Sequence, residues 1–314
     1  MIRPPMVSWR IRPVLFAPIV FALVVVVPTL LIRRSLDGLQ GRTADRLVSD
    51  RIRIALIVAA KSKPNEEIAN ASVVSIFMPS FARSVADDPA ERFQYDLYFG
   101  YDVGDPLYDD AGNLDDLRRI VLGMAAASHI AMRLQTFAYD GVTGKPVHVW
   151  NRLARSAFDD GCHYFYQLND DIVFRTAGWA PMFVQVLSTN PVYKNLGVVG
   201  PTDSNLPGVL TQAFVSRVHF HVFHTLYPNL FVNWYSDNWI TDVYSPDHLF
   251  ILPDVQIENV NVGGSRYTED RGSKAYLGLL VLAGRHDIDE FLLTHQRDRD
   301  VAGDPIAKRD AYHR

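Results

Sequence analysis

The chain has 314 residues, of which 48% are hydrophobic and 21% are charged, and this composition excludes an intrinsically disordered protein. Its formal charge of −4 and its isoelectric point near 6.2 provide no basic field, so nucleic acid is not expected as a partner. The single cysteine, Cys162, excludes an intrachain disulfide and a cysteine-rich zinc module. Because Cys162 lies within an apolar run, we predict that it is a small core residue.

Residues 14–32, VLFAPIVFALVVVVPTLLI, form an uncharged apolar block with the length of a membrane-spanning helix. A cleaved signal peptide and a buried core helix are the alternatives. The block is long for a signal peptide, no small-x-small cleavage site follows it, and arginines on both sides oppose burial in a core. We therefore predict a short tail at 1–13, a transmembrane anchor at 14–32 and a polar stem at 33–50.

The globular part begins at residues 51–60, RIRIALIVAA, which are continuously apolar apart from two arginines and predict a strand buried on both faces of a parallel sheet. A second strand is predicted at 95–102. Helical patterns follow at 113–134 and 145–161, and the second of them leads into the strand that begins at Cys162. This alternation predicts an α/β domain with a mainly parallel, Rossmann-type sheet flanked by helices.

The strand CHYFYQLNDDIVF, 162–174, stops on an amide and two acids before it turns apolar again. Carboxylates are costly to bury unless a cation or hydrogen bonds compensate them. In an open α/β sheet, ligands gather at the carboxyl ends of the strands. Asn169, Asp170 and Asp171 are therefore predicted either to hold a hard divalent cation, Mg²⁺ or Mn²⁺, or to form an ordinary surface turn.

The order of these segments resembles the nucleotide-sugar domain of GT-A glycosyltransferases. The resemblance covers about 51–285 and is most specific over 144–244. It rests on the segments IALIVAAKSK, YFGYD, GKPVHVWNRLARSAFDDG, HYFYQLNDDIVF, GWAPMFVQVLSTNP and LGVVGPTDSN. It implies a GT-A-like fold for the predicted domain, which we place at 51–296, before a charged and loose tail at 297–314.

The same resemblance implies roles for the acid triplet, which occupies the place of the family's DxD motif. Asp171 would be a direct metal ligand, Asp170 would contact the metal or the sugar, and Asn169 would contact the ribose. Asn169 stands where the family often has aspartate, which leaves the motif one charge short. His286 is implied as a third metal ligand by its position.

The resemblance further implies donor contacts after the first two strands, at the start of the following helix and in a glycine-rich loop. These residues are Ala60, Lys61, Asp102, Lys145, Asn151 and Arg266. Taken singly, each lysine is more often a solvated surface charge than a ligand contact.

Aromatic residues crowd the segment 219–246, HFHVFHTLYPNLFVNWYSDNWITDVYSP, which suits either a sugar-binding cleft or an ordinary core. Trp234, Trp239 and Asp242 are the predicted acceptor contacts. Asp237 is the predicted general base if the reaction inverts, and a helix N-cap is the alternative for this residue.

The same segment carries three histidines, His219, His221 and His224, which raise the possibility of a zinc site. On a helix only the last two share a face, so structural roles are favoured. The chain shows no P-loop, no G-x-G-x-x-G turn, no H-E-x-x-H motif and no G-x-S-x-G motif, which weakly excludes common rival enzymes.

These expectations combine into a single-pass, membrane-anchored and metal-dependent glycosyltransferase. It would move a hexosyl or pentosyl group from a nucleotide sugar, a UDP-sugar by resemblance, to a glycan or protein-linked hydroxyl. The expected location is the Golgi or endoplasmic reticulum, as a type II protein with a luminal catalytic domain. A nucleotidyltransferase of related fold and a non-catalytic, membrane-tethered carbohydrate-binding module stay open as alternatives.

Overall fold

The computed structural model describes residues 51–203, 206, 208–260 and 267–303, with side chains as far as residue 295. The predicted tail, transmembrane anchor and stem all lie outside the described residues. Among the helices that are described, none has the length and apolar character needed to cross a bilayer.

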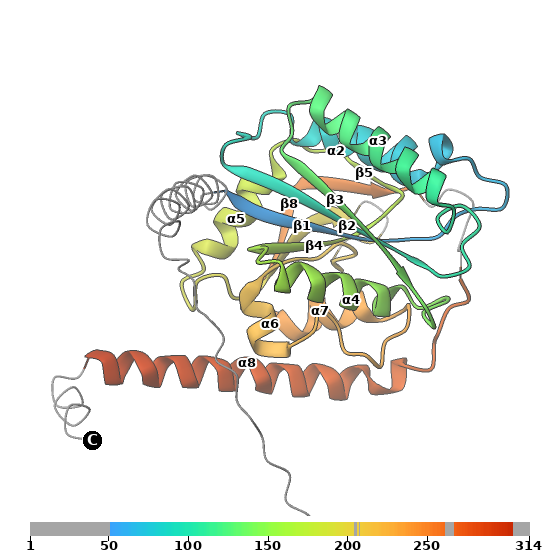
Figure 1. Cartoon of the computed structure of the whole chain (residues 1–314). Coiled ribbons are helices and arrows are strands. Elements are labelled where there is room, and N and C mark those ends of the chain that lie inside the picture. Colours follow the sequence, from blue (N-terminus) through green and yellow to red (C-terminus); the bar gives the residue numbers. More distant parts are fainter. Residues whose placement is uncertain (1–50, 204–205, 207, 261–266, 304–314) are drawn as a thin grey trace, which may run out of the picture. The chain divides into compact units, whose positions relative to one another are not determined.

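Within the described residues, the strands form one mostly parallel sheet (Figure 1) in the order β3-β2-β1-β4-β7-β6-β8-β5. Two residues separate β4 from β5 in sequence, yet these strands stand fourth and eighth in this order, so the sheet curls back on itself. The strands are β1 Ile52–Ala60, β2 Phe93–Asp102, β3 Met132–Tyr139, β4 Tyr164–Asn169, β5 Ile172–Phe174, β6 Val198–Asp203, β7 Phe214–Ser216 and β8 Leu249–Asn259.

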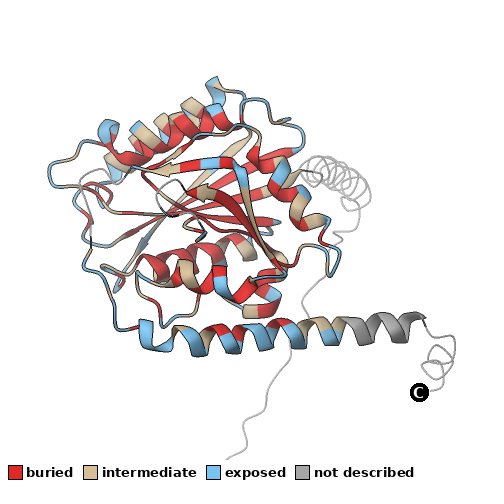
Figure 2. Ribbon diagram, turned by 180° about the vertical axis from the view of Figure 1, so that it is seen from behind, coloured by how far each residue is buried: buried red, intermediate tan, exposed pale blue. Residues whose placement is uncertain are grey.

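Helices cover both faces of the sheet, with α2 and α3 on one face and α4, α6 and α7 on the other (Figure 1). The central strands are buried between these layers, β3 and β8 stay partly exposed, and the helices keep exposed outer sides (Figure 2). The helical elements are the 3₁₀ turn η1 Ile68–Asn70, the π-helical turn η2 Val73–Phe77, α2 Met78–Ser84, α3 Ala111–Ala127, α4 Pro146–Asp159, α5 Trp179–Ser188, α6 Arg217–Phe223, α7 Ser236–Tyr244 and α8 Lys274–Gly303.

The alternation of strands and helices confirms the predicted α/β class. Successive residues of β1 face opposite helix layers and are buried on both, which explains its continuously apolar sequence. Helix α4 begins at Pro146, which is pre-organised for the first turn of a helix. Gly100 in β2 lets α4 approach closely, because a Cβ there would lie 2.8 Å from Cγ1 of Val149.

Two predicted boundaries need correction. The helix predicted at 113–134 ends at Ala127, and its last three residues belong to β3, which pairs in parallel with β2. His129 turns the chain with a φ of 56°, and pairing with β2 outweighs the helical propensity of this stretch. The tail predicted at 297–314 is helical in its first part, because α8 continues to Gly303.

Candidate functional site

The parallel strands of the described sheet end at the same edge. Strands β2, β1 and β4 are mutually parallel neighbours, and β7 runs antiparallel to both β4 and β6. The carboxyl ends of β1, β2, β4 and β6 therefore share one edge, which we call the carboxyl edge. Ligands of open α/β sheets gather at such an edge.

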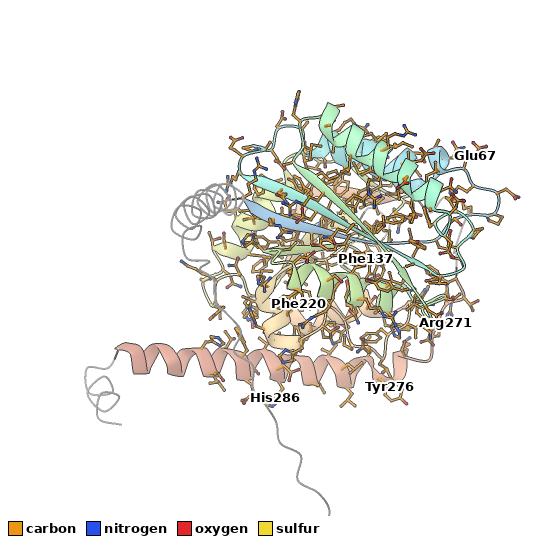
Figure 3. All side chains as sticks on the ribbon, viewed as in Figure 1. Glu67, Phe137, Phe220, Arg271, Tyr276 and His286 are labelled. Atoms are coloured by element: carbon orange, nitrogen blue, oxygen red, sulfur yellow. The ribbon has the colours of Figure 1, made fainter. Side chains whose placement is uncertain are left out.

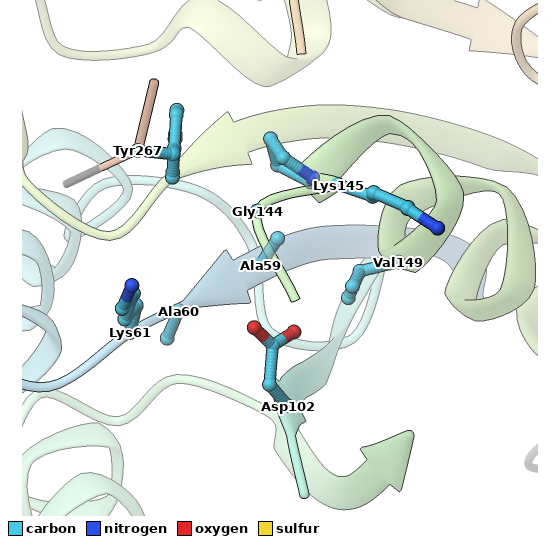
Figure 4. A pocket seen from close by; sticks show the side chains of 9 residues that line it. Ala59, Ala60, Lys61, Asp102, Gly144, Lys145, Val149 and Tyr267 are labelled. Atoms are coloured by element: carbon cyan, nitrogen blue, oxygen red, sulfur yellow. The ribbon is translucent and has the colours of Figure 1, made fainter. Parts of the chain in front are cut away.

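A small pocket lies at this edge, between the ends of β1 and β2 and the start of α4 (Figure 4). The predicted donor contacts Ala60, Lys61, Asp102 and Lys145 all line it. Sequence positions as far apart as 60 and 145 meet here because β1, β2 and α4 end or begin at the same edge. The other lining residues are Ala59, Gly144, Pro146, Val149 and Tyr267.

Asp102 is the acid of this pocket. Its burial raises the pKa of the carboxyl above the usual range. A hydrogen bond from the Gly144 backbone N–H and the nearby Lys61 ammonium oppose that rise. Lys145 extends along the start of α4, where its ammonium lies 3.4 Å from the Gly141 carbonyl oxygen. The pocket thus combines an acid with two lysines, a set that can bind hydroxyl and phosphate groups.

Asn233 ties the pocket to the segment that follows β8, and sequence reasoning missed it. Its side-chain amide donates to the carbonyls of Gly144, at 3.1 Å, and Thr268, at 2.9 Å. Its oxygen accepts from the N–H of Asp270 at 2.9 Å. Tyr267, beside Thr268, lines the pocket, so these bonds hold part of the pocket wall. Nothing in the local sequence distinguishes this asparagine from a turn residue.

The acid triplet lies next to the pocket. Asn169 ends β4 and pairs in register with Ala59, a residue of the pocket lining. Asp170 and Asp171 form the tight turn between β4 and β5, and both are buried. The alternative of an ordinary exposed surface turn is therefore wrong. Buried acids at a strand end need hydrogen bonds or a cation to compensate them.

The predicted third metal ligand does not join these acids. His286 lies on α8 with its side chain exposed, and it points away from the domain (Figure 3). Among the described residues, no three His, Cys, Asp or Glu side chains come together as a metal site. A metal with the two carboxylates as its protein ligands would take its remaining oxygens from water and phosphate, as Mg²⁺ commonly does. Arg266, a predicted donor contact, lies outside the described residues.

Asp237 lies in the first turn of α7, and its side chain is half-buried. Burial raises the pKa of Asp237 to about 7, the Ser236 hydroxyl at 3.3 Å opposes the rise, and Asp203 adds to it. Since Asp203 ends β6, Asp237 also belongs to the carboxyl edge. The capping alternative fails, because Tyr235 occupies the N-cap position and neither Ser236 nor Asp237 does.

Two buried glutamines lie in the same region and were also missed. Gln167 stands two residues before Asn169 on β4, and its oxygen accepts from the Tyr227 hydroxyl at 3.0 Å. Among the described residues, the side-chain nitrogens of Gln167 and Gln212 have no hydrogen-bond partner, although both residues are fully buried. Leaving a buried donor without an acceptor costs about 1–3 kcal/mol. Such donors are typical of sites that bind water or a polar ligand.

The predicted acceptor contacts separate in space. Trp234 is 39% exposed, and the Arg271 guanidinium lies over its ring at 5.6 Å. Trp239 is 2% exposed and donates its indole N–H to the Leu280 carbonyl of α8, so it offers no free ring face. Asp242 is exposed and lies against α8 through its backbone carbonyl, which accepts from Arg285 at 2.7 Å. Only Trp234 keeps a ring face that a sugar can reach.

Asn151 lies on α4 but does not line the pocket. Its amide donates to the Tyr227 carbonyl at 2.8 Å and to the Asn229 side chain at 2.9 Å. Its oxygen accepts from the Tyr227 N–H at 2.9 Å. These bonds use the amide to join α4 to the segment before α7, and a donor contact at Asn151 stays a prediction.

Cys162 and His219 are buried residues with structural roles. Cys162 is fully buried, and burial raises the pKa of its thiol to about 12, which confirms a core role. His219 is buried as well, with one ring nitrogen 2.9 Å from the Tyr244 hydroxyl and the other 3.0 Å from the Thr225 carbonyl. Burial lowers the pKa of His219 to about 4.

Comparisons with known proteins give only distant similarities. No protein-family model and no curated protein matches the sequence. Among solved structures, TarS from S. aureus is 11% identical, with 74% of this chain and 43% of TarS covered, at a TM-score of 0.43. The chain therefore spans less than half of TarS.

Two other solved structures are similar over nearly their whole length. The "putative nucleotide-diphospho-sugar transferase" of Desulfovibrio desulfuricans G20 is 12% identical, with coverages of 77% and 98% and a TM-score of 0.34. The 4-diphosphocytidyl-2C-methyl-D-erythritol synthase of Anaerococcus prevotii is 9% identical, with coverages of 78% and 99% and a TM-score of 0.37. Similarities at this level say nothing about the substrate of this chain, and the α/β description stands on its own strand order.

Proposed function

We propose that this chain is a metal-dependent glycosyltransferase that moves a sugar from a nucleotide sugar to a hydroxyl acceptor. The observation that supports this most is the joint position of the pocket and the buried turn at Asp170 and Asp171. Both lie at the carboxyl edge, and Ala59 and Asn169 join them in register. Binding of a nucleoside beside a diphosphate needs two such neighbouring features.

In this proposal the pocket holds the nucleoside end of a UDP-sugar. Asp102 accepts hydrogen bonds from the ribose or base, and Lys61 attracts the diphosphate. Asp170 and Asp171 would hold Mg²⁺ or Mn²⁺, which as a Lewis acid would neutralise charge on the leaving diphosphate. Two carboxylates suit such an ion, because it keeps several positions for water and phosphate.

The acceptor binds on the side of α7. Asp237 is the general base that takes the proton of the acceptor hydroxyl, and its pKa of about 7 suits this role near neutral pH. Trp234, with its exposed ring, is the surface on which an acceptor sugar stacks. A carboxylate base on the acceptor implies an inverting reaction. The segment 14–32 anchors this domain to the membrane, with the domain on the luminal side.

Binding of nucleotides by the full chain in detergent tests the proposal. Thermal unfolding is followed with UMP, UDP and UDP-sugars, with and without Mn²⁺, and donor hydrolysis is measured by the release of free sugar. We expect UDP to raise the melting temperature in a metal-dependent manner, and at least one UDP-sugar to be hydrolysed slowly. Pyrophosphate release from a nucleoside triphosphate would instead identify a nucleotidyltransferase. Glycan binding with every donor left intact would identify a carbohydrate-binding module.

A further inference from the structure

The first half of α8 exposes a row of apolar side chains on its outer side. Leu279 is 67% exposed, Leu282 is 66% exposed and Tyr276 is 52% exposed, and Ala275 and Ala283 at the two ends of this run are exposed as well. We call these five residues the outer α8 face. In the described residues, Leu293 is exposed further along α8, beyond Asp287 and Glu290, and the other exposed large apolar side chains lie outside this helix, so this face is the main apolar patch.

Packing of α8 on the domain does not explain the outer α8 face. The opposite side of the helix already packs on α7, where Val281 and Ile288 are buried. Gly284 brings the two helices close, because a Cβ there would lie 2.6 Å from Cγ2 of Val243. A surface helix needs one apolar stripe, whereas a helix that is apolar all round is buried on all sides. The exposed leucines on the outer side of α8 therefore indicate that this side contacts a second apolar environment.

Tyr276 shows the direction of this face. Its side chain points away from the sheet and from α6 and α7, on the side of α8 where His286 also lies (Figure 3). Exposed residues cover this side along α8 (Figure 2). The face is therefore open over several turns, which is enough to lie flat on an extended surface.

We propose that the outer α8 face lies in the interfacial region of a lipid bilayer, with α8 parallel to the membrane plane. The chain itself carries an uncharged apolar block at 14–32 that is long enough to span a bilayer, and 18 residues, 33–50, join it to Arg51. Eighteen residues reach at most about 60 Å even when fully extended. The domain is thereby held near a bilayer surface. The inference rests on this predicted anchor and not on the proposed activity.

The charges around the face fit an interfacial helix. Lys274 precedes it and is exposed, whereas the Arg285 guanidinium that follows it donates to the Asp242 carbonyl of α7. A lysine at the border of an apolar face reaches lipid phosphates, and a tyrosine ring suits the boundary between lipid and water. Beyond Arg285, the acids Asp287 and Glu290 are exposed, so contact with the bilayer ends near the middle of α8.

Spin labels on the full chain test this placement. The chain is reconstituted into vesicles of equal parts phosphatidylcholine and phosphatidylglycerol, with a nitroxide attached to Leu279→Cys or Leu282→Cys. The matched control is Ala126→Cys, an exposed position on α3 across the sheet from α8. The native thiol of Cys162 is fully buried and does not take up the label. Tyr276→Cys is a further site if either leucine variant unfolds early on heating.

We expect labels on the outer α8 face to lose collisions with a water-soluble nickel chelate and to keep collisions with oxygen. The Ala126 label should collide freely with the chelate. If labels at both sites collide equally with the chelate, the face lies in water and the inference is overturned. Dipolar broadening at Leu279→Cys that disappears on dilution with unlabelled chain would also overturn it, because a second copy would then cover the face.

Discussion

The central strands carry charged residues at both ends, and the two ends use them differently. At the amino end, Arg53 donates from Nε to Asp96 at 2.8 Å, and Gln94 donates to the other oxygen of the same carboxylate at 2.7 Å. The Cys162 thiol completes this cluster at 3.6 Å from Asp96. At the carboxyl end, burial raises the pKa of Asp102 and of Asp237, and within the described part of the chain neither carboxylate has an ion pair as close as that of Asp96.

We therefore expect the charged groups at the amino end of the sheet to support stability and those at the carboxyl edge to support function. In the cluster at the amino end, the charged groups pair with one another, so they are not available to bind a ligand. The carboxyl edge keeps acids whose charged forms are penalised by burial, and such groups are typical of sites that bind or react. Substitutions at the two ends should therefore have opposite consequences.

The largest effect is expected at the acid turn. Asp171→Asn removes a charge from the proposed metal site, and we expect transfer to fall by a factor on the order of a thousand. Metal-dependent stabilisation by UDP should disappear with it. Nucleotide titrations with and without Mn²⁺ measure this loss. Normal metal dependence in a folded Asp171→Asn variant would contradict the metal role.

At the opposite end of the strands, Asp96→Asn should lower stability without affecting nucleotide binding. It leaves the Arg53 guanidinium without its buried partner, which costs about 3–5 kcal/mol of the free energy of unfolding. Urea unfolding measures the loss, and UDP binding below the transition provides the control. If Asp96→Asn weakens UDP binding as much as Asp171→Asn does, the separation between the two ends does not hold.

Asp237→Asn should reduce transfer by a factor on the order of a hundred while UDP binding survives. The folded pKa of about 7 lies above the ordinary aspartate value of 3.8, so the ionised form is penalised in the folded state. That penalty is complete above pH 7 and absent below pH 4. Asp237→Asn should therefore stabilise the chain by roughly 2–4 kcal/mol at pH 8 and leave it unchanged at pH 4.

Melting temperatures of the parent chain and of the Asp237→Asn variant, measured between pH 4 and pH 8, test whether the substitution stabilises the fold at high pH. A variant with lower stability at pH 8 would show that the carboxylate supports the fold instead. Retention of anomeric configuration in the product would remove the need for a base at this position.

The smallest effect is expected from replacing Asn233, and Asn151, whose side chain makes the same number of hydrogen bonds, is the matched control. Asn233→Ala breaks the link between Gly144 and the segment at Thr268, whereas Asn151→Ala breaks a similar set of bonds outside the pocket. Each should cost about 1–3 kcal/mol of stability. Only Asn233→Ala should also weaken UDP binding, by about tenfold. Equal losses of UDP affinity in both variants would show that Asn151 also contributes to donor binding.

The sequence supported the fold class and most of the pocket. The apolar run at 51–60 and the helical pattern before Cys162 correspond to β1 and α4, since hydrophobic periodicity reflects burial directly. The acid turn was predicted from the cost of burying carboxylates at a strand end, and Asp102 was predicted from the family resemblance. The helix predicted as far as residue 134 failed, because pairing with β2 is a long-range contact that local propensity does not contain.

Composition and local pattern by themselves determined the α/β class, the strand ends that carry acids and the core role of Cys162. Each follows from the cost of burying charge or from the period of apolar residues, which are properties of short stretches. Only the tertiary structure decided that Lys61, Asp102 and Lys145 share a pocket, that Trp239 is buried and that His286 is remote from the acids. These outcomes depend on strand order and on the packing of α8, which join residues far apart in the chain.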